Sequence, residues 1–205
     1  SEIGVGELSQ TVGLVFQNPF NQLSYTADTV SEELAFGLGN RGLTKETMIE
    51  KINRVAEIVQ ITDLLNRNPL ELSGGQVQRV ALAAAIILEP QILILDECTT
   101  QLDPVGSHQI MKTVKTLNEN GMTIIMVDHD MEKIASLANR ILVMKEGKLV
   151  LNDTPEGVFS NPRLMEYGVS APDFYEITKD YFSNTTILTE EQAVKRLQEV
   201  LMNED

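Results

Sequence analysis

The sequence contains no tryptophan and a single cysteine, Cys98, among its 205 residues. One cysteine excludes an internal disulfide and is typical of a protein from a reducing compartment. No apolar run approaches the roughly 20 residues that a membrane-spanning helix needs. Ser1 to Gln10 lack the basic and apolar regions of a secretory signal. These absences predict a cytoplasmic protein that does not cross a membrane.

Basic side chains are also scarce. Lys and Arg total 16 against 30 Asp and Glu, which gives a formal net charge of -14. Because nucleic-acid affinity depends mainly on basic side chains that meet phosphates, this charge argues against a DNA or RNA partner. It argues equally against tight binding to anionic lipid. ATP is also an anion, but a local loop and a helix N-terminus can bind it within an acidic protein.

Strands and helices alternate along the chain. Apolar, β-branched runs predict strands at 11–16, 92–95 and 123–127, the last two buried on both faces. Helices are expected to begin at capping residues, namely Thr29, Ser73, Asp103 and Asp130, and an apolar stripe predicts a further helix at 44–60. The alternation predicts an α/β fold with a mostly parallel sheet and an antiparallel hairpin, residues 140–151, at its edge.

The chain is expected to have two parts. The first domain covers 1–152 and includes a helical subdomain at about 17–75, in which the first helix breaks at Gly37 to Gly42. Capping and proline patterns after Asp153 predict a small helical appendix at 153–205, and its last helix carries an apolar stripe. The residues of that stripe are Val194, Leu197 and Leu201.

Ser73-Gly74-Gly75-Gln76 opens the helix predicted at 73–88. Taken alone, these residues form a capping box, which satisfies the first N–H groups of a helix. Yet two glycines at a helix start lower helix stability. They fit a site where a phosphate approaches the backbone N–H groups and the positive end of the helix dipole. From these residues alone both interpretations stay open.

Polar side chains also follow the predicted strands. Asp96 and Glu97 come directly after the strand at 92–95, at the end where parallel sheets bind ligands. Asp96 is placed to hold Mg²⁺ and Glu97 to polarise an attacking water. Gln17 and His129 follow two other strands, where Gln17 can reach a metal or water and His129 a terminal phosphate. Each of these residues alone is more often an ordinary turn or surface residue.

The order of the motifs carries more information than any one of them. Gln17, LSGGQ at 72–76, ILILDE at 92–97, Leu102-Asp103 and His129 follow one another at strand and helix ends. In this order they resemble the Q-loop, signature motif, Walker B strand, D-loop and H-loop of ABC transporter nucleotide-binding subunits. The resemblance runs from about residue 11 to residue 151.

This resemblance implies a RecA-like P-loop NTPase fold that binds ATP and Mg²⁺. It implies that Asp96 and Gln17 lie at the metal and that Glu97, His129 and Gln17 act in hydrolysis. The residues that would contact the nucleotide of a second subunit in a head-to-tail dimer are Ser73, Gly74, Gly75, Gln76 and Asp103. The implied partners are a transmembrane subunit and a second, identical or related, ATPase subunit, at the cytoplasmic face of the cell membrane.

Three further segments are similar to energy-coupling factor transporters, which import vitamins and metal ions. They are VGLVFQNPFNQL at 12–23, TVSEELAFGL at 29–38 and DTPEGVFSNP at 153–162. The similarity implies that the Q-loop region and the helical subdomain touch the membrane partner. It also implies that the helical tail helps to pair the two ATPase subunits. The transported substrate is not encoded here, because substrate contacts lie in other subunits.

One motif of the family is absent from the sequence. The pattern G-x-x-x-x-G-K-[ST] does not occur, and the only Gly-Lys pair, Gly147-Lys148, lies in the predicted hairpin. That loop supplies most of the contacts to the β- and γ-phosphates. We therefore expect an incomplete ABC ATPase that is inactive alone, either truncated or completed by another chain. Cys98 and Gln101 also depart from the family pattern, but neither change removes a catalytic group.

Two other classes of function share these motifs. A soluble ABC ATPase of DNA repair or translation would carry the same catalytic residues, but the net charge of -14 and the absence of coiled-coil or zinc inserts argue against it. A non-catalytic remnant is the second alternative, favoured by the missing phosphate loop. The presence of Glu97 and His129 favours a working enzyme instead.

Overall fold

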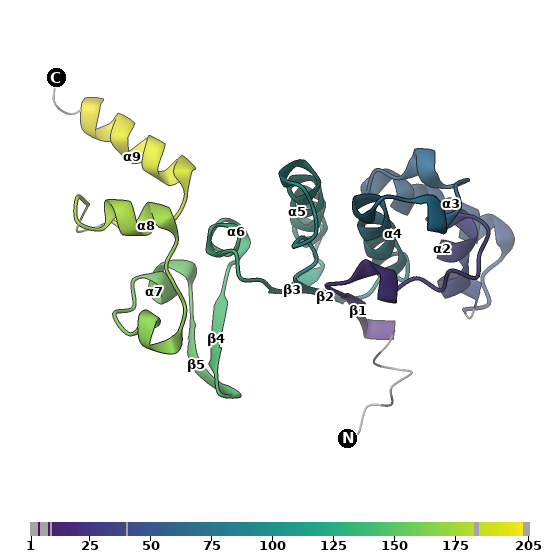
Figure 1. Cartoon of the computed structure of the whole chain (residues 1–205), viewed down its shortest axis with the longest axis horizontal. Helices are drawn as coiled ribbons and strands as arrows, with labels where there is room; N and C mark the ends of the chain where they lie inside the picture. Colours follow the sequence, from purple (N-terminus) through teal and green to yellow (C-terminus); the bar gives the residue numbers. More distant parts are fainter. Residues whose placement is uncertain (1–3, 5–7, 9, 40, 183–184, 203–205) are drawn as a thin grey trace. The chain divides into compact units, whose positions relative to one another are not determined.

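A computed structural model describes residue 4, residue 8 and residues 10–39, 41–182 and 185–202. The chain divides into two compact units, Ser1–Val127 (unit 1) and Asp128–Asp205 (unit 2) (Figure 1). Each unit is described by itself. The division predicted at 152/153 rests on capping and proline patterns rather than on compactness, and it stays a prediction.

Unit 1 is built on a parallel sheet of three strands. The strands are β1 (Val12–Val15), β2 (Ile92–Asp96) and β3 (Thr123–Val127), in the order β1-β2-β3. Both neighbouring pairs are parallel, with Leu14 opposite Ile94 and Ile94 opposite Ile125. The three strands coincide with the three apolar runs, so the predicted α/β fold with a parallel sheet is confirmed.

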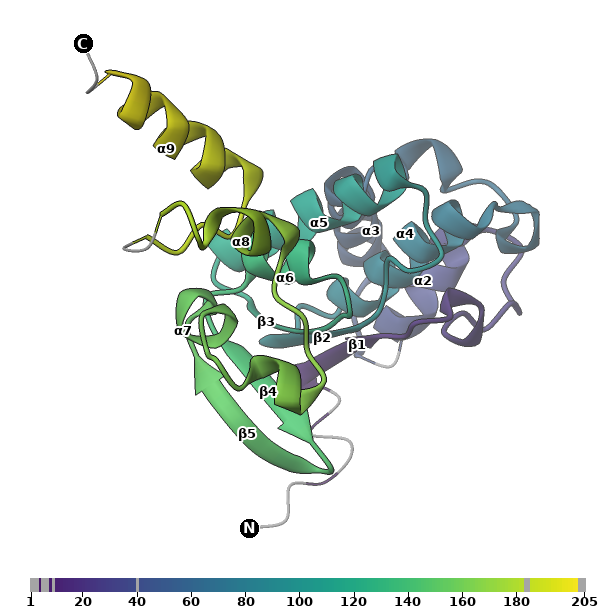
Figure 2. The same cartoon turned by 60° about the vertical axis from the view of Figure 1, so that its left-hand side comes forward.

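Helices cover one face of this sheet. α4 (Gly74–Ile86) packs on β1 and α5 (Pro104–Glu119) packs on β3 (Figure 2). Val15, Leu93 and Leu95 are fully buried, whereas Ile125 and Val127 on the other face are 46% and 53% exposed. The expectation that 123–127 is buried on both faces is therefore wrong. Side chains alternate between the faces of a strand, and β3 is an edge strand with α5 against only one face.

A helical segment connects β1 to β2 and packs on α4. It comprises η1 (Pro19–Asn21), α2 (Val30–Gly39), α3 (Lys45–Ile58), η2 (Thr62–Leu64) and η3 (Pro69–Glu71) before α4. The capping box at the start of α2 is formed, since Thr29 N donates to Glu32 Oε2 (3.1 Å) and Glu32 N donates to Thr29 Oγ1 (3.2 Å). α3 confirms the helix expected at 44–60, and Thr44 is its N-cap.

The helix does end between Gly37 and Gly42 as expected, but it ends late in that range, because α2 continues through Gly37 to Gly39. Glycine in a helix costs about 1 kcal/mol relative to alanine. Leu34 and Leu38 of the same helix are each only 1% exposed. Their burial stabilises the helix by more than the glycine costs, so tertiary packing overrides the local preference.

Unit 2 combines a hairpin with short helices. Its elements are α6 (Met131–Leu137), β4 (Ile141–Lys145), β5 (Lys148–Asp153), α7 (Pro155–Phe159), η4 (Leu164–Tyr167), α8 (Asp173–Thr178) and α9 (Glu190–Met202). Val158, Phe159 and Leu188 form the centre of its core. The turn of the hairpin has positive φ at Glu146 (50°) and Gly147 (74°), as a tight two-residue hairpin turn requires.

The hairpin was expected at the edge of the parallel sheet, but it is not hydrogen-bonded to that sheet. Within the residues that the structure describes, β4 and β5 pair only with each other and form a separate two-stranded sheet. The chain enters α6 between β3 and β4, and the hairpin contributes Val143 to the core of unit 2. None of the described helices is long and apolar enough to span a bilayer.

Candidate functional site

The ends of β1 and β2 bring two predicted site residues together. Gln17 follows β1, Glu97 follows β2, and the Gln17 Nε2 donates a hydrogen bond of 2.7 Å to Glu97 Oε2. The two residues are 80 positions apart in the chain. Their contact arises because the carboxyl ends of parallel strands meet at one edge of the sheet. Gln17 therefore orients the carboxylate of Glu97.

Glu97 has an unusual backbone conformation. Its φ is 45°, in the left-handed region, and its N–H donates to the Val127 carbonyl at 2.9 Å. A non-glycine residue in this region costs of the order of 1 kcal/mol, and such strain is concentrated at functional sites. Cys98, the next residue, is 3% exposed and points into the core. The turn thus ends β2 abruptly and leaves the Glu97 side chain at the sheet edge beside Gln17.

The residues at this edge fit a magnesium ion that is bound mainly through a substrate. Asp96 is exposed at the end of β2 and precedes Glu97 in the chain. Among the described residues there is no cluster of three or more His, Cys, Asp or Glu able to hold a metal. Mg²⁺ usually keeps several waters and binds through one or two carboxylates plus phosphate oxygens. Asp96 and the Gln17 amide are suited to that role.

The glycine motif forms a complete capping box at the start of α4. Ser73 N donates to Gln76 Oε1 (2.9 Å), and Gln76 N donates to Ser73 Oγ (3.4 Å). The N–H groups of Gly74 and Gly75 make no hydrogen bond with any described residue. A side chain at Gly74 would meet nothing within 4 Å, so the backbone here is open. The motif therefore caps the helix and also leaves two donors for an anion.

The segment after Glu97 packs against this motif. A Cβ atom on Gly75 would lie 3.5 Å from Leu102 Cδ2, and Leu102 N donates to the Thr99 carbonyl at 3.1 Å. Asp103 Oδ1 accepts from Gly106 N at 2.7 Å and so caps α5. The cap occupies one carboxylate oxygen of Asp103, so nucleotide contact by this residue stays a prediction.

His129 belongs to unit 2, so its place beside Glu97 also stays a prediction. Its side chain is 67% exposed, with Nδ1 4.0 Å from Asp128 Oδ1. Asp128 itself is 3% exposed, and Lys133 Nζ donates to its Oδ2 at 2.8 Å. Asp130 N donates to Asp128 Oδ1 at 3.0 Å. This buried ion pair, absent from the sequence prediction, fixes the backbone that carries His129.

Two residues that support the Gln17 loop were also not predicted. Gln22 Oε1 accepts from Phe16 N (3.2 Å), and Gln22 Nε2 donates to the Ala81 carbonyl (2.7 Å), which attaches the loop to α4. Glu33, on α2 and 7% exposed, accepts hydrogen bonds from Ser24 N at 2.6 Å, Ser24 Oγ at 2.8 Å and Tyr25 N at 3.2 Å.

Glu33 also affects Tyr25. Burial, with a further contribution from the charge of Glu33, raises the pKa of Tyr25 above its ordinary value. The folded chain therefore favours the neutral phenol. The contribution of Tyr25 to the free energy of unfolding is fully present below the ordinary tyrosine pKa and is lost as pH rises through the raised pKa. Tyr25 is therefore neutral at pH 7.

Replacing Glu33 by Gln should destabilise this loop. The amide NH₂ would face N–H donors in place of an acceptor oxygen, and hydrogen bonds to a charged group contribute about 1.5–3 kcal/mol each. We expect the free energy of unfolding of unit 1 to fall by about 2–3 kcal/mol. Urea denaturation measures this change, and hydrogen exchange at Ser24 N and Tyr25 N should accelerate.

A matched control is Glu57→Gln on α3, where the side chain is exposed. This change should alter stability by no more than about 0.5 kcal/mol. Equal stability of the Glu33→Gln and Glu57→Gln variants would show that Glu33 does not hold the loop.

Comparisons with known proteins agree with the geometry. Residues 3–100 match the protein family described as ABC transporter. The sequence is 44% identical, over 172 residues, to the energy-coupling factor transporter ATP-binding protein EcfA1 of Halalkalibacterium halodurans, covering 83% of this chain and 61% of that protein. It is 40% identical, over 204 residues, to EcfA1 of Bacillus subtilis, covering 96% of this chain and 72% of that protein.

A solved structure is similar as well. It is cbiO1 from Clostridium perfringens, described as part of the ABC transporter complex cbiONQ, with a TM-score of 0.72 and 30% sequence identity. The match covers 89% of this chain and 68% of that chain. The chain spans 61% of the length of the first curated relatives that it matches.

Proposed function

The chain belongs to the family of energy-coupling factor transporter ATP-binding proteins, and we propose that it contributes the hydrolytic residues of an ATP-driven motor for a membrane importer. The observation that carries the proposal is the 2.7 Å hydrogen bond between Gln17 and Glu97 at the carboxyl edge of the parallel sheet. It supports a carboxylate held in place to act on a water. A vitamin or a metal ion is the proposed cargo, from the subgroup resemblance.

The reaction is the attack of water on the γ-phosphorus of ATP, with ADP as the leaving group. Glu97 accepts a hydrogen bond from the attacking water and increases its nucleophilicity, while Gln17 orients that carboxylate. Mg²⁺, when bound beside Asp96, neutralises charge on the phosphate oxygens. His129 is proposed to contact the γ-phosphate. In phosphoryl transfer, positioning and electrostatic stabilisation account for most of the catalysis.

The signature motif is proposed to act on a second nucleotide. The open N–H groups of Gly74 and Gly75, at the positive end of the α4 dipole, are suited to a phosphate of ATP held by another subunit. Leu102 packs on Gly75 and so connects this motif to the turn that carries Glu97. The phosphate loop that completes such a site has to come from outside the 205 residues.

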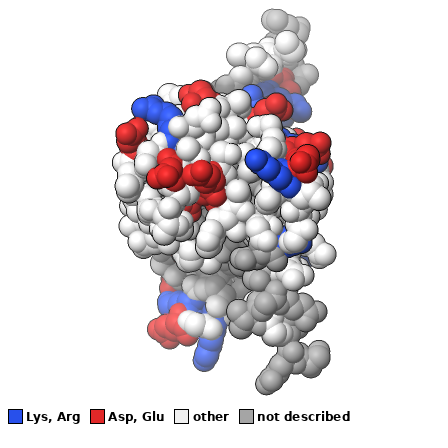
Figure 3. All heavy atoms as spheres, turned by 90° about the vertical axis from the view of Figure 1, so that its right-hand side faces the viewer, with Lys and Arg blue, Asp and Glu red and all other residues white. Residues whose placement is uncertain are grey.

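Exposed apolar side chains support two protein partners. In the helical segment of unit 1, Phe36 is 65%, Ile49 is 49% and Leu70 is 73% exposed. Figure 3 looks onto the side of unit 1 that carries α2 and α3, and most of that surface is uncharged. We propose that this segment contacts a transmembrane subunit, which would place the chain at the cytoplasmic face of the membrane.

The second partner is a further ATPase subunit. Along α9 the apolar stripe predicted from the sequence is exposed, at 47% for Val194, 52% for Leu197 and 66% for Leu201. A helix with such a stripe is stabilised when the stripe is buried against another surface. We propose pairing of ATPase subunits through this helix. A soluble ABC ATPase acting on nucleic acid is not favoured, because the relatives are transporter subunits and the net charge is -14.

A chimera tests the proposed function. Residues 11–205 would be joined to the segment of the Bacillus subtilis relative that precedes the matched region, and the product expressed with that relative's transporter partners. We expect it to co-purify with the membrane partners and to hydrolyse ATP at a rate within about tenfold of the relative, since residual misfit of a few contacts costs about 1.4 kcal/mol. A folded chimera that binds ATP but neither associates with the membrane partners nor hydrolyses ATP would contradict the proposal.

A further inference from the structure

Unit 1 contains a groove at the opposite end of the parallel strands from Glu97. It has a volume of about 800 Å³ and lies between α3, the C-terminal end of α4 and the turn that connects α5 to β3. Ile58, Ile86 and Met122 are among the apolar residues that line it, and Lys51, Arg54 and Glu89 add charge. None of these residues takes part in the proposed hydrolysis.

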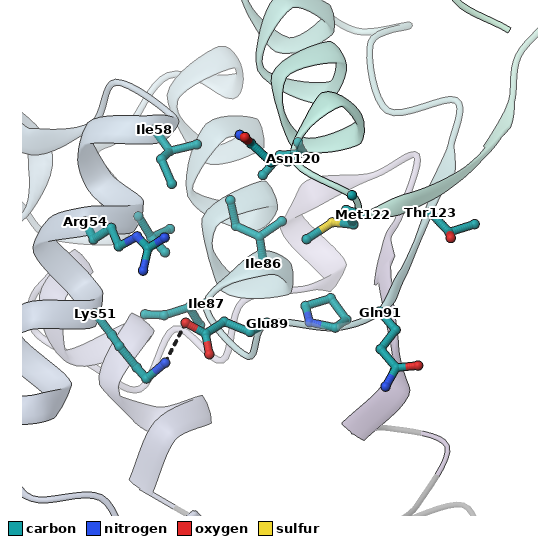
Figure 4. A pocket seen from close by; sticks show the side chains of 14 residues that line it. Lys51, Arg54, Ile58, Ile86, Ile87, Glu89, Gln91, Asn120, Met122 and Thr123 are labelled. Atoms are coloured by element: carbon teal, nitrogen blue, oxygen red, sulfur yellow. Dashed lines mark ion pairs between the residues drawn. The ribbon is translucent and has the colours of Figure 1, made fainter. Parts of the chain in front are cut away.

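The described residues that line the groove include two positive side chains but only one negative side chain. Lys51 Nζ forms an ion pair with Glu89 Oε1 at 2.6 Å, so these two charges compensate each other. Arg54 lies one turn further along α3 and is exposed, and among the described residues no side chain or backbone group forms an ion pair or hydrogen bond with it. Figure 4 shows the Arg54 side chain directed toward the space between α3 and Met122. The groove thus has one uncompensated positive charge in a chain of net charge -14.

The rim of the groove is rigid. Glu89 has a left-handed backbone (φ 52°), and its N–H donates to the Ile86 carbonyl at 2.8 Å. The neighbouring Leu88 carbonyl accepts from Arg41 Nη1 at 2.8 Å. The loop is therefore held from two directions, by Arg41 and by Lys51, before anything binds. A preformed site loses little conformational entropy on binding.

We propose that this groove binds an acidic peptide segment of a partner protein, with an apolar side chain on Ile86 and Met122 and a carboxylate paired with Arg54. The guanidinium group offers the planar, two-pronged donor geometry that carboxylates match. A basic segment would meet Arg54 and Lys51 unfavourably. The exposed rim and the mixture of apolar and charged residues fit an extended segment better than an enclosed small-molecule site, which is mostly apolar and buries its ligand.

Such an occupant would touch both the helical segment and the sheet-bearing core. Ile58 belongs to α3, whereas Met122 precedes β3. Near the groove, α5 is joined to α3 by a hydrogen bond in which Thr113 Oγ1 donates to the Ile58 carbonyl at 3.4 Å. A bound segment would therefore restrain α3 against the core. The proposal does not depend on ATP hydrolysis.

The test uses the 205-residue chain with methyl-labelled Met and Ile, observed by NMR. The probe is the peptide acetyl-Glu-Leu-Glu-Leu-Leu-Glu-amide, and the reference probe has Lys in place of each Glu. We expect saturable shifts of the Met122, Ile58 and Ile86 methyl signals with the acidic peptide, at a Kd of about 0.1–1 mM. The signals of Met165 and Ile49, outside the groove, should not shift.

Arg54→Glu should raise the Kd at least about tenfold, the effect of losing one charge-assisted hydrogen bond. Arg54→Gln keeps a polar side chain at this exposed position and should also weaken binding. The matched control Lys45→Glu makes the same charge reversal on α3 outside the groove and should leave the Kd within twofold. No saturable shift, equal binding of the lysine peptide, or equal affinity of the Arg54→Glu variant would each overturn the proposal.

Discussion

ATP hydrolysis by the chimera should fall about 10²–10⁴-fold when Glu97 is replaced by Gln, the contribution typical of one general base. The carboxylate is held at the carboxyl edge of the sheet by Gln17 Nε2 at 2.7 Å. An amide at this position is nearly isosteric but cannot accept a proton from water. Binding of ATP should persist, because Glu97 is proposed to contact the water rather than the nucleotide. A phosphate-release assay and a nucleotide-binding assay on the same preparation separate the two effects.

A matched substitution tests whether the removal of any exposed carboxylate lowers the rate of hydrolysis. Glu119 lies at the end of α5 and is exposed, so Glu119→Gln should leave the rate within twofold. Gln17→Ala should lower the rate less than Glu97→Gln, because it removes the group that orients the base and not the base itself. Retention of a tenth or more of the rate by Glu97→Gln would show that another residue activates the water.

Local sequence signals predicted the elements of the fold well. The three strands follow from short apolar runs that end at turn residues, and the starts of α2, α4 and α5 follow from capping residues whose hydrogen bonds span three positions. The errors arise where distant packing decides. Gly37 lies within a helix because Leu34 and Leu38 are buried, and β3 has an exposed face because α5 packs against its other face.

In the candidate site, too, some residues could be predicted from the sequence and others could not. Gln17 and Glu97 could be placed together from the rule that parallel strands end at one edge, although they are 80 positions apart. Glu33 could not be identified from the sequence, because acidic residues are common in the first turn of a helix. The three hydrogen bonds that Glu33 accepts come from a preceding loop, whose position the sequence does not reveal. The ion pair between Lys133 and Asp128 could not be predicted either, because the burial of Asp128 depends on the fold of unit 2.

Residues 1–205 alone should not bind Mg-ATP in the micromolar range. The only Gly-Lys pair, Gly147-Lys148, lies at the tight turn of the β4–β5 hairpin, with Gly147 at φ 74°. Asp96 and Glu97 lie at the carboxyl edge of the parallel sheet. Their negative charges repel a polyphosphate unless a metal ion and a cationic loop compensate these charges. The open N–H groups of Gly74 and Gly75 contribute only a weak anion site. Calorimetric titration should therefore show no saturation below about 1 mM, a binding free energy weaker than about 4 kcal/mol.

The same titration on the chimera isolates the cause, because the chimera differs from the 205-residue chain only in the segment that replaces residues 1–10. Its affinity for Mg-ATP should be at least about 100-fold higher, corresponding to about 2.7 kcal/mol from the phosphate contacts. Glu97→Gln in both proteins suppresses turnover during the measurement. Micromolar binding by residues 1–205 alone would mean that these residues form a phosphate site of their own. In that case the signature helix, with Gly74 and Gly75 open at its start, would be the first place to look for it.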